Sequence, residues 1–476
     1  MHGGGFTMRV PLFLTSLFCT SLAVAAYAQR PQPQPVPDSR MKVDVLLVVA
    51  HPDDDVMLGG YLARLVFDEH KRVAVVYTTD GDGGGNATAT ESGQALGMVR
   101  QIEARRALHV LGIDMVWFLS GHDTPGQDPL RSLDRWNHGQ FLDDLVRIVR
   151  IVRPGIILTW LPASVSGENH GDHQASGVLA VEAFDIAGDP LAFPEQVSPP
   201  RDLHGMSNLT EGLLPWQPQK LYFITDAFEV FSPYWHNPAT RSPFRTNLGD
   251  GTGPVYNVTG ISPSQNVSYA ELMAHQQAEY ATQEGNLASP AIHSHDFSLF
   301  AYPEHFIFGK SLVGGSVTGD IFEGISDKSI PYRRVQISSP PDPSGITLEI
   351  GDPWHFYAAF WHAHQLDHLA KFIPIPELGA GSGERLHIPL LACNHTAQSA
   401  DIAITSTLPA GFVDAAPTTS ISIAPNTCNA LFAEIETPRS GHAGWQQLSW
   451  QAAQGPQSDG SASIRIYVDQ SGGLPQ

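Results

Sequence analysis

Val43-Asp-Val-Leu-Leu-Val-Val-Ala-His-Pro-Asp-Asp-Asp55 is the stretch of sequence that decides the fold. Its first part, Val43 to Ala50, is rich in β-branched residues, which is typical of a strand buried on both faces of a parallel sheet. A histidine and three aspartates follow within five residues, and burying such groups costs free energy unless they are solvated, paired or bound to a metal. The stretch therefore predicts a central strand that delivers polar side chains to one edge of a sheet.

Strand and helix patterns alternate from Val43 to about Thr225. Further strands are predicted at 73–78, 115–119 and 156–160, and helices at 57–70, 95–111 and 141–152. This alternation predicts an α/β fold with a Rossmann-like doubly wound, mostly parallel sheet. Such sheets bind ligands at the carboxyl ends of their strands, near the point where the strand order reverses.

The chain has 476 residues, more than one hydrophobic core usually organises, so we predict several domains. Residues 384–470 hold short strand-like runs separated by turn residues, which predicts a C-terminal Ig-like β-sandwich. Leu378-Gly-Ala-Gly-Ser-Gly383 reads as a flexible linker. The predicted units are a signal peptide (1–28), a Pro/Gln-rich spacer (29–41), the α/β domain (42–310), an intermediate region with the linker (311–383) and the sandwich (384–470).

The N-terminus has the pattern of an export signal. Arg9 precedes a largely apolar run, and Ala26-Tyr-Ala28 fits a small-x-small cleavage site. The run is short for a membrane span, although a retained N-terminal anchor is the alternative. We expect an exported protein, periplasmic or extracellular, without a stable membrane span after signal removal. Cys393 and Cys428 would remain, either as a disulfide or as two buried thiols.

The charge balance excludes one class of partner. Lys and Arg total 27, Asp and Glu total 48, and the formal net charge is −21. Such acidity opposes binding to a phosphate backbone or to an anionic membrane surface. We therefore expect no nucleic-acid partner.

A second motif, His170-Gly-Asp-His173, follows the predicted strand 156–160 and begins a predicted helix. One imidazole from this motif, together with His51 and Asp54, would form a set of two histidines and one carboxylate. That set suits Zn²⁺ with an open position for water. Fe²⁺ and other divalent ions accept the same types of ligand, so the metal stays open.

Taken together, Ala50-His-Pro-Asp-Asp-Asp55 and His170-Gly-Asp-His173 resemble the PIG-L/LmbE-like family of zinc-dependent N-acetylglucosaminyl deacetylases. The resemblance covers roughly Val43 to Thr225. Two separated motifs, each at the end of a predicted strand, are more specific than either motif alone. The motif departs from the family at Asp55, where the family usually has Glu.

The resemblance implies a role for each motif residue. Asp53 would be the general base, and His170 would stabilise the tetrahedral oxyanion while Asp172 orients it. We expect the adjacent Asp172 to keep the His170 imidazole cationic, because a neighbouring carboxylate raises a histidine pKa. The implied metal ligands are His51, Asp54 and His173.

The implied reaction is hydrolysis of the acetamide of an N-acetylated saccharide or glycoconjugate. Two alternatives stay open: a metal-dependent amidohydrolase acting on a non-sugar amide, and a catalytically inactive carbohydrate-binding protein. The C-terminal sandwich would either contact glycan or space and stabilise the rest of the chain.

Five further residues are candidates for substrate contacts. Asp80 and Asp123 follow strands, where a solvated loop is the alternative, and Arg100 would grip a hydroxyl or phosphate unless it pairs with Glu103 on the same helix face. Glu168 stands where some relatives use an aromatic donor, and His275 would reach the site from a later helix. The complete set is Asp80, Arg100, Asp123, Glu168 and His275.

His362, His364 and His368 suggest a second metal site by composition alone. Aromatic residues surround them, and no acidic or cysteine partner has a ligand-like spacing. We therefore predict a packed aromatic segment at this place.

Overall fold

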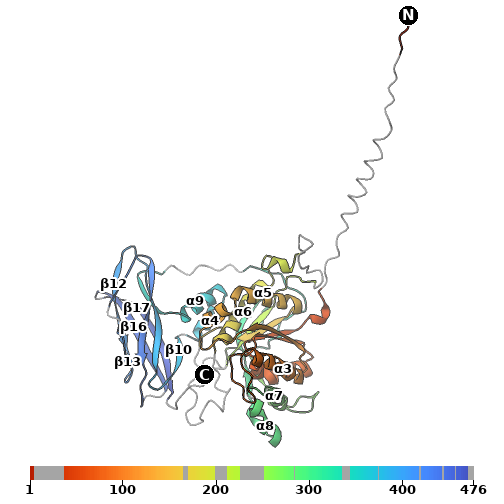
Figure 1. The fold of residues 1–476 in the computed structure, drawn as a ribbon, viewed down its shortest axis with the longest axis horizontal. Helices are drawn as coiled ribbons and strands as arrows, with labels where there is room; N and C mark the ends of the chain where they lie inside the picture. Colours follow the sequence, from red (N-terminus) through yellow and green to blue (C-terminus); the bar gives the residue numbers. More distant parts are fainter. Residues whose placement is uncertain are drawn as a thin grey trace.

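The computed structural model describes residues 1–4, 37–164, 170–198, 212–225, 251–283, 285–334, 343–373, 375–417, 420–441, 444–455 and 457–469. An α/β part and a β-rich part lie side by side (Figure 1). The predicted signal peptide and most of the spacer, residues 5–36, lie outside the described residues. Within the described ranges, no helix has the length and apolar character needed to cross a bilayer.

The α/β part is built on a six-stranded sheet with the order β3-β2-β1-β4-β5-β8. Every neighbouring pair is parallel except the last, in which β8 runs antiparallel to β5. All residues of β1, β2, β4 and β5 are buried, as the β-branched run predicts. The strands are β1 (Val45–Val49), β2 (Val73–Thr79), β3 (Met115–Gly121), β4 (Ile156–Trp160), β5 (Lys220–Ile224) and β8 (Ile307–Ser311).

The strand order reverses between β1 and β4, because β2 and β3 extend the sheet on one side and β5 on the other. The predicted α/β core with a mostly parallel, doubly wound sheet is confirmed. Both motifs follow the two strands at this reversal, β1 and β4, where such sheets bind their ligands.

Helices cover both faces of the sheet (Figure 1). In α5, Phe141, Leu145, Ile148 and Val152 recur at helical spacing and are buried against the sheet. One face carries α4 (Pro129–Arg135), α5 (His138–Val152), α6 (Gly171–Ile186) and α9 (Trp354–Ala363). The other face carries α2 (Gly59–Phe67), α3 (Gln94–Val110), α7 (Tyr269–Ala278) and α8 (Gly285–Ser294).

Short elements complete the α/β part. A small antiparallel pair joins β6 (Val255–Asn257) to β7 (Pro303–His305). The 3₁₀ turns are η1 (Ser39–Met41), η2 (Asp54–Leu58), η3 (Pro194–Gln196), η6 (Ser298–Phe300) and η7 (Asp367–Lys371).

The β-rich part consists of two sheets that share one hydrophobic core. Along β11, the inward residues Leu386, Ile388, Leu390 and Ala392 are buried in alternation, as expected for a strand with one face on a core. One sheet has the order β10-β17-β16-β12-β14, with β10 (Glu377–Gly381), β17 (Gln457–Asp469), β16 (Gly444–Gln454), β12 (Ala400–Thr407) and β14 (Ile421–Ile423). The other has the order β13-β15-β11-β9, with β13 (Val413–Asp414), β15 (Thr427–Glu436), β11 (Arg385–Asn394) and β9 (Ile346–Ile350).

A disulfide joins Cys393 on β11 to Cys428 on β15. The two cysteines are direct register neighbours of the antiparallel pair, so their side chains emerge on the same face. Of the two alternatives left open by the sequence, the structure has the bridge.

The intermediate region 311–383 differs from its prediction. β9 belongs to the sandwich, the chain then returns through α9 and η7 to pack on the core of the α/β part, and β10 re-enters the sandwich. The segment predicted as a flexible linker is largely strand β10, which pairs in parallel with β17 and buries Ala380. Its glycines indicated flexibility, but pairing with a distant strand supplied the hydrogen bonds that order it.

Candidate metal centre

The turn after β1 is folded around the carboxylate of Asp54. Asp54 Oδ2 accepts hydrogen bonds from the backbone N–H groups of Ala50 at 2.8 Å and His51 at 2.9 Å. It also accepts one from Trp160 Nε1 at 2.7 Å. Three donors hold one carboxylate oxygen, and the second oxygen, Oδ1, faces the imidazoles of the two motifs.

Three donor atoms converge at this point. His51 Nδ1 lies 3.0 Å from His173 Nε2, His173 Nε2 lies 3.3 Å from Asp54 Oδ1, and His51 Nδ1 lies 3.7 Å from Asp54 Oδ1. Tetrahedral zinc, with bonds of about 2.0–2.1 Å, separates its ligand atoms by roughly 3.3 Å. The three groups thus have the chemistry and spacing of a site for a divalent cation.

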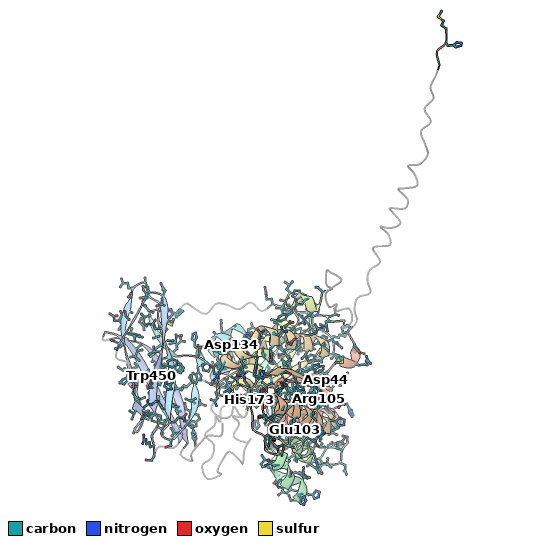
Figure 2. All side chains as sticks on the ribbon, viewed as in Figure 1. Asp44, Glu103, Arg105, Asp134, His173 and Trp450 are labelled. Atoms are coloured by element: carbon teal, nitrogen blue, oxygen red, sulfur yellow. A yellow bond between two sulfur atoms is a disulfide. The ribbon has the colours of Figure 1, made fainter. Side chains whose placement is uncertain are left out.

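Neighbouring strands bring the two motifs together, although His51 and His173 are 122 positions apart in the sequence. His51 follows β1, and His173 lies in the first turn of α6, which follows β4. Figure 2 shows His173 within the α/β part, away from Trp450 in the sandwich. The structure brings the three predicted ligands to one point, and metal binding itself stays a prediction.

Trp160 is a residue of this centre that the sequence did not identify. Its ring stacks on His173, with ring centroids 4.0 Å apart and an interplanar angle of 2°. The same indole donates to Asp54, so one side chain orients two of the three predicted ligands. Its place as the last residue of a buried strand was visible in the sequence, but nothing local indicated its contacts.

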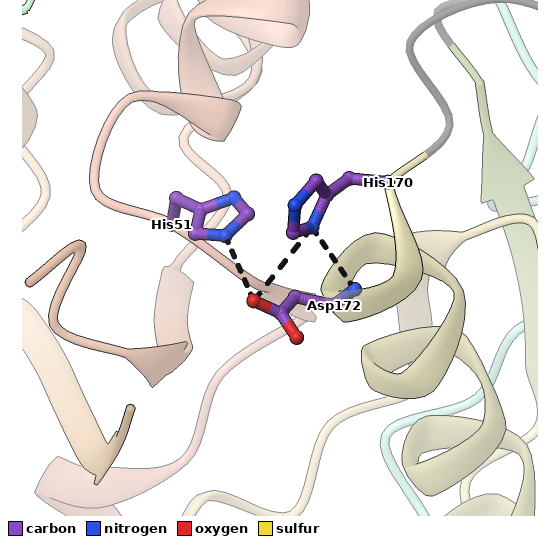
Figure 3. A group of neighbouring side chains, drawn as sticks. All are labelled: His51, His170 and Asp172. Atoms are coloured by element: carbon purple, nitrogen blue, oxygen red, sulfur yellow. Dashed lines mark hydrogen bonds and ion pairs between the residues drawn. The ribbon is translucent and has the colours of Figure 1, made fainter. Parts of the chain in front are cut away.

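The carboxylate of Asp172 lies closer to the ring of His51 than to the ring of His170 (Figure 3). Its Oδ2 lies 3.3 Å from His51 Nε2 and 3.6 Å from His170 Nδ1, and it accepts the Thr124 N–H at 2.8 Å. A carboxylate on the second nitrogen of a ligand histidine fixes the tautomer and orientation of the ring. Asp172 is thus placed to orient His51, whereas the family resemblance implied that it orients His170.

His170 precedes α6 and caps the helix. Its Nδ1 accepts the backbone N–H of Asp172 at 3.2 Å. Burial, together with the nearby imidazoles of His51 and His173, lowers the pKa of His170 to about 3. This direction is opposite to the expected cationic imidazole, because burial and two neighbouring rings outweigh one carboxylate. A neutral ring that accepts at Nδ1 carries its proton on Nε2 and donates from there.

Asp53, the predicted base, has a strained backbone. Its φ is 126° and its ψ is −18°, in a region that L-residues rarely adopt. The turn holds this conformation through hydrogen bonds from Val56 N to Asp53 O at 2.9 Å and from Asp54 N to His51 O at 3.2 Å. Such strain costs on the order of 1–3 kcal/mol and concentrates at functional sites. The observation supports a function for Asp53 without assigning it.

Asp55, where the motif departs from the family, is fully buried in a polar cage. Its carboxylate accepts from Tyr77 Oη, Tyr280 Oη and Gln276 Nε2, each at 2.5 Å. Burial raises the pKa of Asp55 despite these three donors. Asp55 therefore ties the turn to β2 and to the region of α7, and Gln276 is the α7 residue that reaches it.

Arg100 organises a loop. Its terminal nitrogens donate to Gly81 O at 2.7 Å and to Gly85 O at 2.8 Å. A Cβ atom on Gly84 would lie 2.7 Å from the guanidinium nitrogens, so a larger residue there would displace the end of the Arg100 side chain. These carbonyl contacts do not test the predicted contact of Arg100 with substrate, which stays a prediction. Pairing with Glu103 is not formed, because Glu103 accepts from Thr282 N at 3.0 Å and from Thr282 Oγ1 at 2.6 Å.

Of the other substrate candidates, Asp123 lies at the metal centre and Asp80 has other hydrogen-bond partners. Asp123 Oδ1 lies 3.9 Å from His51 Nε2, at the centre, while its Oδ2 accepts from Gly83 N at 3.0 Å. Asp80 instead accepts from Gln101 at 2.8 Å and from Ser120 at 3.3 Å. His275 is exposed on α7, and its ring lies 6.5 Å from that of Phe297 between centroids. Glu168 lies outside the described residues.

Comparison with known proteins finds matches that include the residues of this centre. Residues 46–184 match the family model described as PIG-L, GlcNAc-PI de-N-acetylase. A 1D-myo-inositol 2-acetamido-2-deoxy-alpha-D-glucopyranoside deacetylase from Streptomyces scabiei is 27% identical over 332 residues, which cover 63% of this chain and 94% of that protein.

Two further relatives are diacetylchitobiose deacetylases. The protein from Thermococcus kodakarensis is 33% identical over 153 residues, 31% of this chain, and the chain spans about half, 51%, of its length. The solved structure of the N,N'-diacetylchitobiose deacetylase from Pyrococcus horikoshii is 19% identical, with a TM-score of 0.37, and the match covers 63% of this chain and 94% of that chain.

The family match spans β1, both motifs and most of α6, which are the elements that build the centre. The sandwich lies beyond it. The matching segment and the named relatives thus support the assignment of residues 46–184 to a PIG-L/LmbE-like deacetylase family.

Proposed function

We propose that the chain is an exported, metal-dependent hydrolase that removes the N-acetyl group from an N-acetylated saccharide or glycoconjugate. The observation that carries the proposal is the convergence of His51 Nδ1, His173 Nε2 and Asp54 Oδ1 within 3.7 Å of one another. The substrate class is supported by the relatives, whose names describe deacetylases of acetamido sugars.

His51, Asp54 and His173 would hold the metal. Zn²⁺ suits this donor set, and Fe²⁺ or another divalent ion accepts it too. When bound, such an ion supplies Lewis-acid polarisation of a carbonyl and lowers the pKa of water toward about 7. Trp160 and Asp172 support the ligands by holding their rings and carboxylate in fixed orientations.

Asp53 and His170 would supply the proton transfer and the oxyanion stabilisation. Asp53, next to Asp54 in the turn, would take a proton from the attacking water and deliver it to the leaving nitrogen. Addition of the water oxygen to the carbonyl carbon forms the C–O bond and the oxyanion, and the C–N bond then breaks as the nitrogen takes the proton, which gives acetate and a free amine. His170, as a neutral donor, would stabilise the oxyanion, an effect commonly worth about 3–4 kcal/mol.

The proposed substrate contacts differ in their support. Asp123 would accept a hydrogen bond from a substrate hydroxyl, and the support is its position at the centre, with Oδ1 3.9 Å from His51 Nε2. Arg100 would act on substrate through the loop that it organises, Gly81 to Gly85. Roles for Asp80, Glu168 and His275 in substrate binding rest on the sequence alone.

Export is supported by the signal-like pattern of residues 1–28 and by the Cys393–Cys428 disulfide, which is typical of oxidising compartments. The orders β9-β11-β15-β13 and β17-β16-β12 match strands A-B-E-D and G-F-C of an Ig-type sandwich, which supports an Ig-like assignment. Glycan contact by this domain is part of the proposal, and it rests on the proposed carbohydrate substrate alone.

The test is a panel of N-acetyl sugars and acylated non-sugar amines, assayed for acetate release by the full chain with and without a chelator. We expect release from sugars, its loss on chelation, and recovery on adding Zn²⁺. Turnover confined to non-sugar amides would overturn the substrate class. Binding of sugars without any turnover at saturating Zn²⁺ would overturn the enzymatic assignment.

A further inference from the structure

We infer that Tyr357, on helix α9, is a positioning residue for the metal centre, acting through Gln174 and the loop of residues 122–128. The inference rests on the proposed function for its kinetic part, and its metal-binding part is independent of any substrate. It assigns a role to a segment that lies far beyond the family match at residues 46–184.

Helix α9 packs on the α/β core, although the strands before and after it belong to the sandwich. The chain leaves the sandwich after β9, forms α9 against the α/β core, and returns to the sandwich at β10 (Figure 1). Trp361 Nε1 donates to Pro162 O at 2.9 Å, and His364 Nδ1 lies 2.7 Å from Asp185 Oδ2. Tyr357 is 2% exposed in this contact. The helix is therefore anchored to the α/β part by directional bonds as well as by apolar packing.

Tyr357 on α9 contacts Gln174, the residue that follows the predicted ligand His173. Tyr357 Oη donates to Gln174 Oε1 at 2.7 Å, and Gln174 is fully buried next to His173. Gln174 Nε2 donates to Gln127 O at 3.2 Å. A carbonyl oxygen only accepts, so the amide nitrogen must face Gln127 and the amide oxygen must face the tyrosine. The hydroxyl thus stabilises the one amide orientation that holds the 122–128 loop.

The 122–128 loop contacts the metal centre through Asp172. Thr124 N donates to Asp172 Oδ2 at 2.8 Å, and that oxygen lies 3.3 Å from His51 Nε2. The loop fits closely against the start of α6, because Gly171 N donates to Gly126 O at 2.9 Å. A Cβ on Gly171 would lie 2.9 Å from Asp128 O. A shift of the loop therefore moves the donor to the carboxylate that orients a metal ligand.

The tests are Tyr357→Phe and a matched control, Tyr269→Phe. The control removes another buried hydroxyl, which donates to Asp68 Oδ2 at 2.7 Å at the far end of α2 from the centre. Zinc affinity is measured by chelator competition on the metal-free full chain, alongside the thermal midpoint and the kcat and KM of acetate release.

We expect Tyr357→Phe to weaken zinc binding and to lower kcat, each by about 3–10-fold, with KM changed less than about twofold. This is smaller than the 10–100-fold typical of a group bonded directly to a ligand, because Gln174, the 122–128 loop and Asp172 lie between Tyr357 and His51. Tyr269→Phe should lower the thermal midpoint comparably and leave zinc affinity unchanged. Equal zinc affinities in the two variants would overturn the inference.

Gln174→Met is a second variant, which tests the same route if Tyr357→Phe does not fold. It removes both hydrogen bonds of the Gln174 amide. Its effect on zinc affinity should match that of Tyr357→Phe, and the double variant should be no worse than the stronger single one, because both act on one route. Additive losses would overturn the route. If the wild-type chain releases no acetate from any N-acetyl sugar, the proposed function fails, whereas the zinc titrations still decide the role of Tyr357.

Discussion

Two histidine-rich regions of this chain have similar composition and opposite outcomes. In the first, His51 and His173 meet at 3.0 Å beside Asp54. In the second, each histidine takes a different partner: His362 contacts Asp367 at 3.1 Å, His364 contacts Asp185 at 2.7 Å, and His368 contacts Phe308 O at 2.9 Å. The prediction of a packed aromatic segment there agrees with these contacts and with the buried rings of Tyr357, Phe360 and Trp361.

The difference shows that convergence, more than residue type, makes a candidate metal centre. Two adjacent strands of the central sheet aim the first set at one point. A single helix and the turn after it spread the second set over neighbouring elements. The second set therefore anchors α9, whereas the first can share one ion.

The largest expected effect comes from removing one histidine of each set. His173→Ala should abolish stoichiometric zinc binding and lower kcat/KM by at least about 100-fold, since a ligand is lost. His364→Ala should keep the zinc and lose on the order of 1 kcal/mol of stability. Metal analysis, kinetics and thermal denaturation measure these effects. Zinc retained by His173→Ala at wild-type affinity would contradict the assigned centre.

Asp53→Asn separates catalysis from metal binding within the first set. We expect kcat to fall about 10²–10⁴-fold, because the base is lost, while the zinc content stays stoichiometric. Asn also tolerates unusual backbone angles better than most residues, so the strained turn should persist. Kinetics and metal analysis on the same preparation check this, and near-normal kcat would exclude Asp53 as the base.

Asp172→Asn tests whether the first set depends on its supporting carboxylate. Zinc affinity should fall about 10–100-fold, because the neutral amide oxygen of Asn is a weaker acceptor than the carboxylate for the Nε2–H of His51. Chelator competition measures the zinc affinity of the variant and of the wild-type chain. The corresponding change in the second set, Asp185→Asn, should leave zinc affinity alone, and an equal loss in both variants would indicate a general effect on folding.

The pH dependence should also distinguish the first set. Burial disfavours charge on His51, but the carboxylates of Asp123, Asp172 and Asp54 outweigh it and hold the pKa of His51 well above its usual value. In metal-free protein this contribution to stability is present below pH about 6.5 and is lost as the pH rises through the higher folded pKa. A metal must displace that proton, so zinc affinity should increase with pH, by up to about tenfold per unit.

The measurement is the thermal midpoint of metal-free and zinc-loaded protein across pH. As the pH rises, the metal-free protein should lose the stability contributed by His51, while the stabilisation by zinc should increase. The control is His362→Gln, which changes the second set only and should leave both curves in place. A zinc affinity independent of pH between 6 and 8 would contradict a proton on His51.

Much of the α/β part could be predicted because its signals are local. A buried strand such as Val45–Val49 is a continuous apolar run, and the two motifs follow strands that become neighbours. The β10 strand could not be predicted, since its glycines indicate a linker and its order comes from pairing with β17, more than eighty residues later. The loop contacts of Arg100 could not be predicted either, because nothing local showed that Gly81 and Gly85 would present carbonyls to it.

The sequence by itself determined the central strand, the order of the two motifs and the chemistry of the groups they carry, because these depend on neighbours along the chain. Tertiary structure alone decided that Asp172 faces His51, that Trp160 lies flat on His173, and that Tyr357 reaches Gln174 across 183 positions. The reason is physical: each of these contacts is formed by side chains from different elements, and their approach is set by how the sheet and helices pack.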